Sequence, residues 1–335
     1  MNRENKDLIL DIENLVVRYE TEDGIVRALN GIDLKLGYKR TIGLVGETGA
    51  GKTTAALAML RLVPNPPGVV SCDKLFIDGQ DILSVPIHEM EQIRGQEISM
   101  IFQDPMTALN PVFTVGEQIA ESLEIHEHLS KKDALKRAGE MLELVGIPAS
   151  RANEYPHQFS GGMKQRVVIA IALACNPKLL IADEPTTALD VTIQAQVLEL
   201  MNSLKEKYDT SMIMITHDLG IVAEVCDEVA VMYAGRIVEQ GTLEDVFNHT
   251  LHPYTEGLFN SLPNIKNRQA KLKPIKGLMP DPTNLPSGCA FAPRCNYATE
   301  ACWKGQPPIR RVSDTHTVAC VAYDRPDFHI QRGKA

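Results

Sequence analysis

The sequence predicts an α/β domain built around a parallel sheet. Four runs rich in Val, Ile and Leu each lead into polar residues: TIGLVG at 41–46, ISMIFQ at 98–103, LLIADE at 179–184 and MIMITH at 212–217. Continuous apolar runs of this length are typical of buried parallel strands. The segment TAALAML at 54–60, after the first run, is typical of a helix. In such sheets the chemistry collects where the strands end.

Smaller elements are expected around this sheet. The segments 8–19 and 25–36 are rich in Val, Ile and Leu and flank a turn at Glu22-Asp23-Gly24, so they predict a small antiparallel sheet. Residues 87–164 are charged and predict a helical insert. Within it, Ser130 is a good helix N-cap, and Gly146 ends the helix that follows.

The chain of 335 residues divides into three parts that differ in amino-acid composition. We expect one large α/β domain over residues 1–260. Proline residues interrupt 261–287 and predict an extended connector. Residues 288–335 hold four of the seven cysteines and predict a small Cys-rich C-terminal module.

The amino-acid composition disfavours membrane-spanning, secreted and nucleic-acid-binding proteins. The content of 44% hydrophobic and 23% charged residues is that of a globular protein, and no apolar stretch approaches the ~18 residues of a membrane span. The start of the sequence lacks a secretory signal pattern, so we expect a cytoplasmic protein. The net charge of −9, without a basic stripe, disfavours nucleic acid as a partner.

A phosphate-binding loop follows the first apolar run. The motif G-x-x-x-x-G-K-[ST] is matched between a predicted strand and a predicted helix by Gly46, Glu47, Thr48, Gly49, Ala50, Gly51, Lys52 and Thr53. Its glycines allow backbone N–H groups to face phosphate oxygens, and the helix N-terminus adds a favourable dipole. We expect Lys52 to reach the terminal phosphates of ATP, Thr53 to ligate Mg²⁺, and Thr54 to complete the nucleotide-binding set. These features predict a P-loop NTPase.

An acidic pair ends the third run. Asp183 and Glu184 would lie near the bound nucleotide at the end of a buried strand. We expect Asp183 to hold Mg²⁺ through a water molecule and Glu184 to orient or deprotonate the water that attacks the γ-phosphate. Two carboxylates can thus divide two roles.

Residues 159–166, FSGGMKQR, resemble the signature loop of the ABC (ATP-binding cassette) ATPases. The order of the motifs along the chain also resembles that family. An aromatic residue comes first, followed by the phosphate loop, a glutamine, the signature, the acidic pair, an Ala-Leu-Asp segment at 188–190 and a histidine. The resemblance implies a RecA-like core with an antiparallel β subdomain and a helical subdomain.

The resemblance also implies residue roles. Tyr19 would stack on adenine, Gln103 would sense Mg²⁺ and the γ-phosphate, and His217 would contact the γ-phosphate and help to hold Glu184. Ser160, Gly161 and Gly162 would cap ATP bound to a second cassette, so that ATP joins two subunits and hydrolysis releases them. The sequence has Phe159 and Met163 where the commonest signature, LSGGQ, has Leu and Gln.

The C-terminal part resembles the oligopeptide and dipeptide branch of the family. The segments HPYT at 252–255 and PSGCAFAPRC at 286–295, with further cysteines, carry this resemblance. The cysteine spacing, C-x5-C-x6-C-x17-C, differs from the short-paired patterns of zinc sites. With the resemblance, this all-thiolate set favours a [4Fe–4S] cluster; Zn²⁺ and structural thiols remain alternatives. The ligands would be Cys289, Cys295, Cys302 and Cys320.

These observations predict the ATP-hydrolysing subunit of an importer for di- and oligopeptides, at the cytoplasmic face of the membrane. Its partners would be a second, homologous but non-identical ATPase subunit, two membrane permeases and, indirectly, an external peptide-binding protein. Nickel or another small solute is an alternative cargo. An ABC ATPase that acts on nucleic acid or ribosomes is a further alternative, which the single set of motifs disfavours. A non-hydrolysing regulatory module is another, which the intact Lys52, Asp183 and Glu184 disfavour.

Overall fold

Two sheets meet around the phosphate-binding loop in the computed structural model, which describes residues 7–187, 189–262, 273–325 and 327–330. The first sheet is antiparallel, with the spatial order β2-β1-β5-β6 and β4 paired to β1. Its strands are β1 Leu8–Thr21, β2 Gly24–Gly37, β4 Gly68–Ser71, β5 Lys74–Ile77 and β6 Gln80–Asp81. The expected strand pair thus forms, since β1 and β2 are joined at the predicted turn.

The second sheet carries the parallel strands. In spatial order its strands are β12 Arg310–Arg311, β13 Thr317–Val318, β11 Arg236–Thr242, β10 Glu228–Tyr233, β3 Thr41–Val45, β9 Ser211–Thr216, β8 Leu179–Asp183 and β7 Ile98–Ile101. The five strands from β10 to β7 pair in parallel, and they include all four apolar runs predicted as buried strands.

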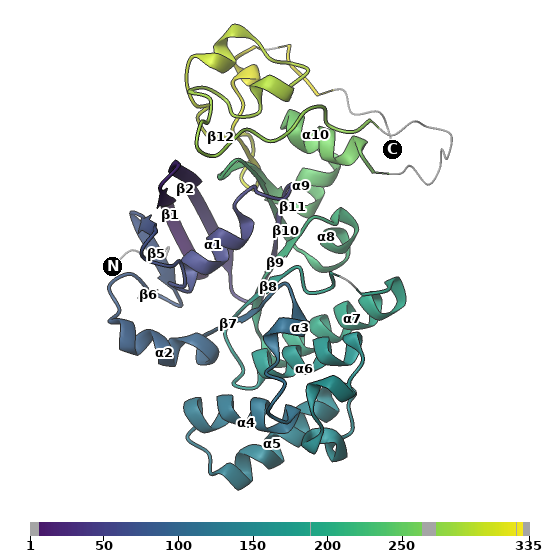
Figure 1. The fold of residues 1–335 in the computed structure, drawn as a ribbon. Coiled ribbons are helices and arrows are strands. Elements are labelled where there is room, and N and C mark those ends of the chain that lie inside the picture. The colour runs from purple at the N-terminus through teal and green to yellow at the C-terminus, as the bar shows by residue number, and fades with distance from the viewer. Residues whose placement is uncertain (1–6, 188, 263–272, 326, 331–335) are drawn as a thin grey trace.

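Helices cover this sheet and form a separate layer below it in Figure 1. The α-helices are α1 Lys52–Met59, α2 Ile87–Gln96, α3 Pro105–Ala108, α4 Val115–His126, α5 Lys131–Leu144, α6 Gly161–Leu173, α7 Val191–Tyr208, α8 Leu219–Val225, α9 Leu243–Asn248 and α10 Pro253–Asn260. The short 3₁₀ helices are η2 Ala149–Asn153, η3 Pro156–Gln158, η4 Ala292–Arg294, η5 Glu300–Trp303 and η6 Val321–Asp324.

The two faces of the parallel sheet bury two cores. Along β9, Ile213 and Ile215 pack toward the antiparallel sheet and α1, while Met212 and Met214 pack toward the helical layer. Successive side chains of a strand point to opposite faces, so every position of β9 is buried. This explains why the run is apolar throughout rather than alternating.

The helical layer starts later than the expected insert. The range 87–164 contains β7, which pairs with β8 at the edge of the parallel sheet, and Ile98, Ser99 and Ile101 of this strand are buried. The helices of the layer begin where the sequence places caps. Ser130 caps α5 by accepting a hydrogen bond from the Asp133 amide, and Thr114 forms a capping box with Glu117 at α4.

The C-terminal module extends the parallel sheet. Strand β13 pairs with the outer edge of β11, and β12 pairs with β13. The buried carboxylate of Glu239 on β11 contacts the His316 ring at 2.9 Å and also accepts hydrogen bonds from the Leu251 and His252 amides. Part of the expected connector, 263–272, lies outside the described residues, and its remainder runs back toward the antiparallel sheet, where the Arg27 amide donates to the Pro282 carbonyl.

No helix within the described part of the chain combines the length and the apolar character that a bilayer crossing requires.

Candidate nucleotide-binding site

The phosphate loop joins β3 to α1, and its glycines occupy positions that a side chain could not. Gly46 has φ of 155°, and a Cβ atom there would lie 2.3 Å from the Met232 carbonyl oxygen. Gly51, the residue before α1, has φ of 103°, and its Cβ would lie 2.7 Å from the Ala28 carbonyl oxygen. The loop therefore packs closely against neighbouring backbone on both sides, and only glycine fits.

Lys52 begins α1 and turns back over the loop. Its Nζ atom donates hydrogen bonds to the carbonyl oxygens of Gly46 at 2.7 Å and Glu47 at 3.1 Å, and the residue is only 6% exposed. Burial lowers the pKa of Lys52, while the carboxylates of Glu184 and Asp183 act in the opposite direction. A cationic side chain is thus held at a helix N-terminus, an arrangement suited to binding phosphate.

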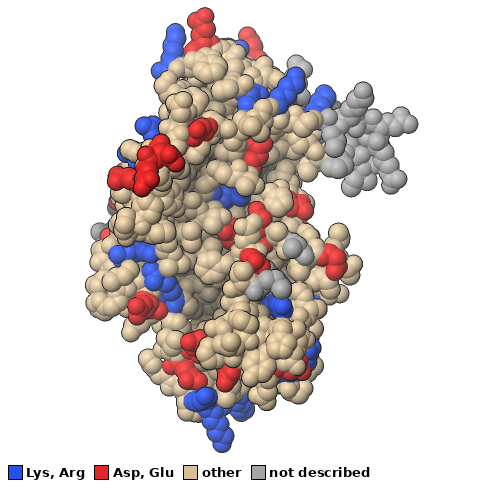
Figure 2. All heavy atoms as spheres, viewed as in Figure 1, with Lys and Arg blue, Asp and Glu red and all other residues tan. Residues whose placement is uncertain are grey.

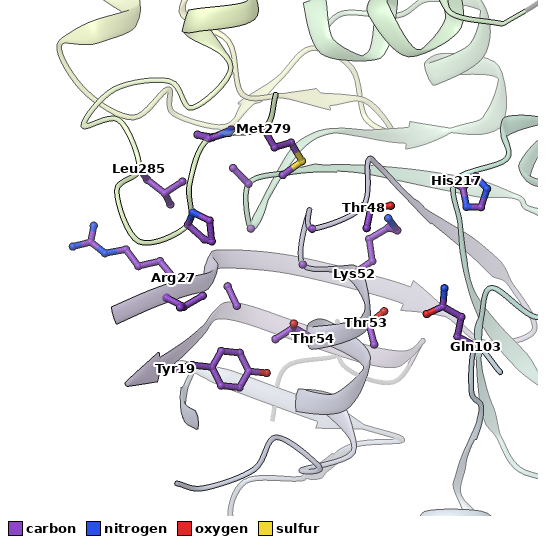
Figure 3. A pocket seen from close by; sticks show the side chains of 18 of the residues that line it. Tyr19, Arg27, Thr48, Lys52, Thr53, Thr54, Gln103, His217, Met279 and Leu285 are labelled. Carbon is purple, nitrogen blue, oxygen red and sulfur yellow. The ribbon is translucent and has the colours of Figure 1, made fainter. Parts of the chain in front are cut away.

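An open pocket of about 470 Å³ lies beside this loop. Ten residues of the predicted site line it: Tyr19, Thr48, Gly49, Gly51, Lys52, Thr53, Thr54, Gln103, Glu184 and His217. Figure 3 shows Tyr19 at one end, Gln103 and His217 at the other, and Lys52 and Thr53 between them. An elongated pocket with an aromatic ring at one end and polar groups at the other suits a nucleotide.

Other predicted residues lie outside the lining. Gly46, Glu47 and Ala50 belong to the body of the loop, and Asp183 lies buried behind it at the end of β8, 2% exposed. Burial raises the pKa of Asp183, although a hydrogen bond with Thr53 acts in the opposite direction. Thr53 and Asp183, two of the three residues expected at the magnesium ion, are therefore hydrogen-bonded to each other.

Glu184 is the centre of a polar cluster at the far end of the pocket. Its carboxylate accepts hydrogen bonds from Gln103 Nε2 at 3.1 Å and Thr187 Oγ1 at 2.9 Å, and His217 Nδ1 lies 3.1 Å away. Burial raises the pKa of Glu184, but the hydrogen bonds from His217 and Thr187, together with the charges of His217 and Lys52, bring the pKa below its ordinary value. The structure thus brings together the ends of β7, β8 and β9.

The signature residues lie away from the pocket. Ser160 caps α6 by accepting a hydrogen bond from the Met163 amide, and Ser160 and Gly161 are exposed. Phe159 is buried, and the Arg151 guanidinium lies 4.3 Å from its ring centre. Arg151 also donates to the Met163 sulfur at 3.5 Å. The two departures from the common signature are therefore packed against one arginine, and they leave the cap of α6 intact.

The four C-terminal cysteines converge although they come from separate segments. Cys289, Cys295, Cys302 and Cys320 line one small pocket, next to His252 on the N-terminal side of α10. All seven cysteines, which lie within the described residues, are free thiols. Of the remaining three, Cys175 and Cys226 are buried, and Cys72 is half-buried.

Backbone amides point at these sulfurs. The Tyr297 amide donates to Cys295 Sγ and the Thr299 amide to Cys302 Sγ, each at 3.4 Å. Burial raises the pKa of the Cys295 thiol to about 12 and that of Cys320 to about 11. Across the described ranges, no three or more His, Cys, Asp or Glu side chains are placed to hold a single metal ion.

Comparisons with known proteins agree with this geometry. The profile of the family described as ABC transporter matches residues 29–187, and that of the oligopeptide/dipeptide transporter C-terminal region matches residues 238–302. The oligopeptide transport ATP-binding protein OppD of Bacillus subtilis is 53% identical over 92% of this chain and 87% of its own length. The chain belongs to the ATP-binding subunits of the oligopeptide/dipeptide ABC transporter family. It is therefore an ABC ATPase.

Other similar proteins support the same family assignment. AppD of Bacillus subtilis is 50% identical over 94% of this subunit and 97% of its own length, and OppD of Haemophilus influenzae is 49% identical over 88% and 91%. A dimeric ATP-binding cassette solved after hydrolysis, with ADP and Pi, aligns with a TM-score of 0.63 and 27% identity over 70% of this subunit and 98% of that chain. The ABC cassette fold predicted from the sequence is confirmed.

One wall of the nucleotide pocket of this transporter ATPase, formed by the connector, was not predicted from the sequence. Met279, Pro280, Pro282 and Leu285 of the connector line it together with Arg27 on β2. In Figure 3, Met279 and Leu285 lie across the pocket from Tyr19. A proline-rich segment 260 residues downstream of Tyr19 has no local pattern that reports this contact, so only the fold could reveal it.

Proposed function

We propose that this subunit hydrolyses ATP to drive the uptake of di- and oligopeptides through two membrane permeases, to which peptide is delivered by an external binding protein. The observation that supports a peptide cargo is the match of residues 238–302 to the family described as the oligopeptide/dipeptide transporter C-terminal region. Relatives named for oligopeptide transport match nearly the whole chain. We place the subunit at the cytoplasmic face of the membrane, where ATP is available.

The site geometry supports a division of roles. We assign adenine stacking to Tyr19 and phosphate binding to Lys52 with the loop amides. Thr53, Asp183 and Gln103 would hold Mg²⁺, since oxygen donors are what this ion prefers. Bound magnesium would offset the charge of the phosphates.

Glu184 is the general base in this scheme. Its carboxylate would take a proton from the attacking water, while His217 and Gln103 hold it in position. The hydrogen bonds that lower its pKa keep the carboxylate ionised at neutral pH, which is the form that a base requires.

We propose that the exposed Ser160 and Gly161 cap ATP on a second cassette. A Cβ on Gly161 would meet no atom within 4 Å, so the start of α6 offers its amides to another molecule rather than to this chain's own loop. A solved relative with this fold is a dimer bound to ADP and Pi. The partner would be homologous and non-identical.

Exposed apolar side chains between residues 102 and 125 supply a candidate permease contact. Phe102, Val112, Phe113 and Ile125 are 46%, 70%, 50% and 57% exposed. Phe113 and Ile125 line an open groove of about 300 Å³ along α4. Exposed apolar groups on one helical segment are typical of a protein contact. Phe102 directly precedes Gln103, so a permease bound here would be connected to the hydrolytic site.

Nucleic acid remains disfavoured as a partner. On the face shown in Figure 2, basic and acidic side chains are interspersed and no continuous basic region forms. Together with a net charge of −9, this surface does not supply the attraction that a phosphate backbone needs.

The cargo is tested by uptake into proteoliposomes that contain this subunit, its partner ATPase, the two permeases and the binding protein. We expect MgATP in the lumen, on the ATPase side, to drive accumulation of a labelled tripeptide added outside. Omission of ATP is the control. ATP-driven uptake of Ni²⁺ without uptake of the peptide would refute the proposed cargo in favour of the alternative one.

For the cysteine pocket we propose a [4Fe–4S] cluster held by Cys289, Cys295, Cys302 and Cys320. Four thiols facing one pocket supply the usual ligand number, and N–H groups directed at two of the sulfurs are the contacts that stabilise thiolates. The cluster would tie together a module with little core of its own, since the described core there comprises Val318, Cys320, Ala322 and Phe328.

Metal analysis of anaerobically purified protein tests this assignment. We expect about four irons and four sulfides per chain with broad visible absorption. Substitution Cys295→Ser should remove most of the iron, whereas Cys72→Ser, outside the pocket, should not. One zinc per chain, or no metal, would refute the cluster and leave the ATPase assignment intact.

A further inference from the structure

Arg294 connects the C-terminal module to the phosphate loop. It ends η4, directly before Cys295, and its side chain is 5% exposed. Nη1 donates to Glu47 Oε2 at 2.6 Å and Nη2 donates to Glu47 Oε1 at 3.0 Å. The two groups thus form a forked pair between residues 247 positions apart in the sequence.

The arginine is itself held in place. Its Nε donates to the Lys276 carbonyl at 2.9 Å, and Nη1 lies 3.3 Å from the Tyr233 hydroxyl. Tyr233 packs against Phe291, with ring centres 5.2 Å apart, and Phe291 also lines the cysteine pocket. The guanidinium is therefore held in a fixed position by the connector at Lys276 and by Tyr233 on β10, which distinguishes it from a mobile surface arginine.

Glu47 makes hydrogen bonds with three side chains, and two of these belong to residues after position 250. Its carboxylate is paired with Arg294, its amide donates to the Tyr254 hydroxyl at 2.8 Å, and its carbonyl accepts from Lys52 at 3.1 Å. Tyr254 is fully buried, with its ring centre 5.4 Å from that of Phe291. The second residue of the phosphate loop is thus anchored to the C-terminal part of the chain.

The charge of Glu47 makes this anchor matter for nucleotide binding. A carboxylate in a phosphate-binding loop repels the phosphates of ATP unless a cation offsets it. Glu47 is near enough to Lys52 to affect its pKa. Arg294 supplies the offsetting charge, and the forked geometry also fixes the direction of the loop between Gly46 and Gly49.

We propose that Arg294 is a positioning residue for ATP binding: by pairing with Glu47, it makes the affinity of the phosphate loop for nucleotide depend on the C-terminal module. The proposal goes beyond the transport function. It rests on the nucleotide-binding role assigned to the loop, which the unaltered protein tests by itself.

Four variants of the full chain separate charge from packing: Arg294→Gln, Arg294→Lys, Glu47→Gln and the double variant Arg294→Gln/Glu47→Gln. Their Kd for MgADP is measured by calorimetry, and KM and kcat for ATP are measured with the partner ATPase present. We expect Arg294→Gln to raise Kd and KM about ten-fold with kcat nearly unchanged, since both ground and transition states lose the same interaction.

The other variants carry the decisive comparison. Glu47→Gln breaks the pair but also removes the repelling charge, so we expect it to raise Kd less than Arg294→Gln does. The double variant should match Glu47→Gln rather than Arg294→Gln, and Arg294→Lys, which keeps the charge without the fork, should lie between. Additive losses in the double variant would overturn the proposal.

Arg311→Gln is the matched control, because Arg311 is an exposed arginine of the same module and makes no contact with the loop among the described residues. We expect it to leave Kd unchanged. If Arg294→Gln does not fold, Arg294→Lys and Glu47→Gln decide the question. An unchanged Kd in folded Arg294→Gln overturns the inference alone, whereas an unaltered protein that binds no nucleotide overturns the proposed function.

Discussion

With Glu184 replaced by glutamine, the subunit is expected to accumulate with its partner ATPase as an ATP-bound dimer. The amide cannot accept the proton of the attacking water, while Lys52 and Asp183, which hold the phosphates and Mg²⁺ in our scheme, are unchanged. We expect kcat to fall about a thousand-fold, within the range that general bases contribute, with nucleotide affinity retained. Phosphate release and size-exclusion chromatography with MgATP measure the two effects.

The isosteric change at an unrelated site is the control for this experiment. Glu140→Gln on α5 alters an exposed carboxylate and should leave both turnover and dimer lifetime unchanged. A Glu184→Gln subunit that stays monomeric with MgATP and its partner present would count against the clamp. One that hydrolyses ATP at the normal rate would show that another group is the base.

Replacement of Lys52 by alanine should abolish nucleotide binding at micromolar concentrations. The ammonium group is the only cation that the described loop residues 46–53 contribute, and its loss leaves the triphosphate facing buried carboxylates. We expect Kd for MgATP to rise by about a hundred-fold or more, in line with a lost hydrogen-bonded charge pair. Calorimetry with MgATP, on the Glu184→Gln background to prevent hydrolysis, gives the value.

Lys136→Ala, at an exposed position of α5, is the matched control and should leave Kd unchanged. Circular dichroism establishes that the Lys52 variant is folded. A folded Lys52→Ala protein that still binds MgATP within about three-fold of the unaltered affinity would contradict the phosphate role given to this residue.

The parallel sheet and the phosphate loop could be predicted because their signals are local. A strand buried on both faces must be apolar at every position, so β3, β8 and β9 are visible as continuous runs. The loop is visible because glycines and a lysine must follow such a strand at fixed spacing. Glu184, Gln103 and His217 could be placed together because parallel strands deliver their carboxyl ends to one edge.

Contacts between distant segments could not be predicted. Nothing in the sequence near Glu47 indicates that its partner is Arg294, since an exposed and a buried arginine look alike in a list of letters. The connector wall at Met279 and Leu285 was hidden in the same way. The four C-terminal cysteines were expected together as ligands of one group, and they do line one pocket; the packing of Phe291 and His252 beside them could not be predicted from the spacing.

The attachment of β13 to β11 has a consequence for how the molecule unfolds. Strand β11 would otherwise present an unpaired edge, and such edges recruit strands from other chains. The tail covers this edge with its own short strands and fixes it through the buried contact of Glu239 with His316. Cassette and tail therefore share one hydrogen-bonded ladder and should lose their structure in a single cooperative step. A truncated protein that lacks the C-terminal module would expose the edge of β11, and we expect it to aggregate rather than to function as a smaller ATPase.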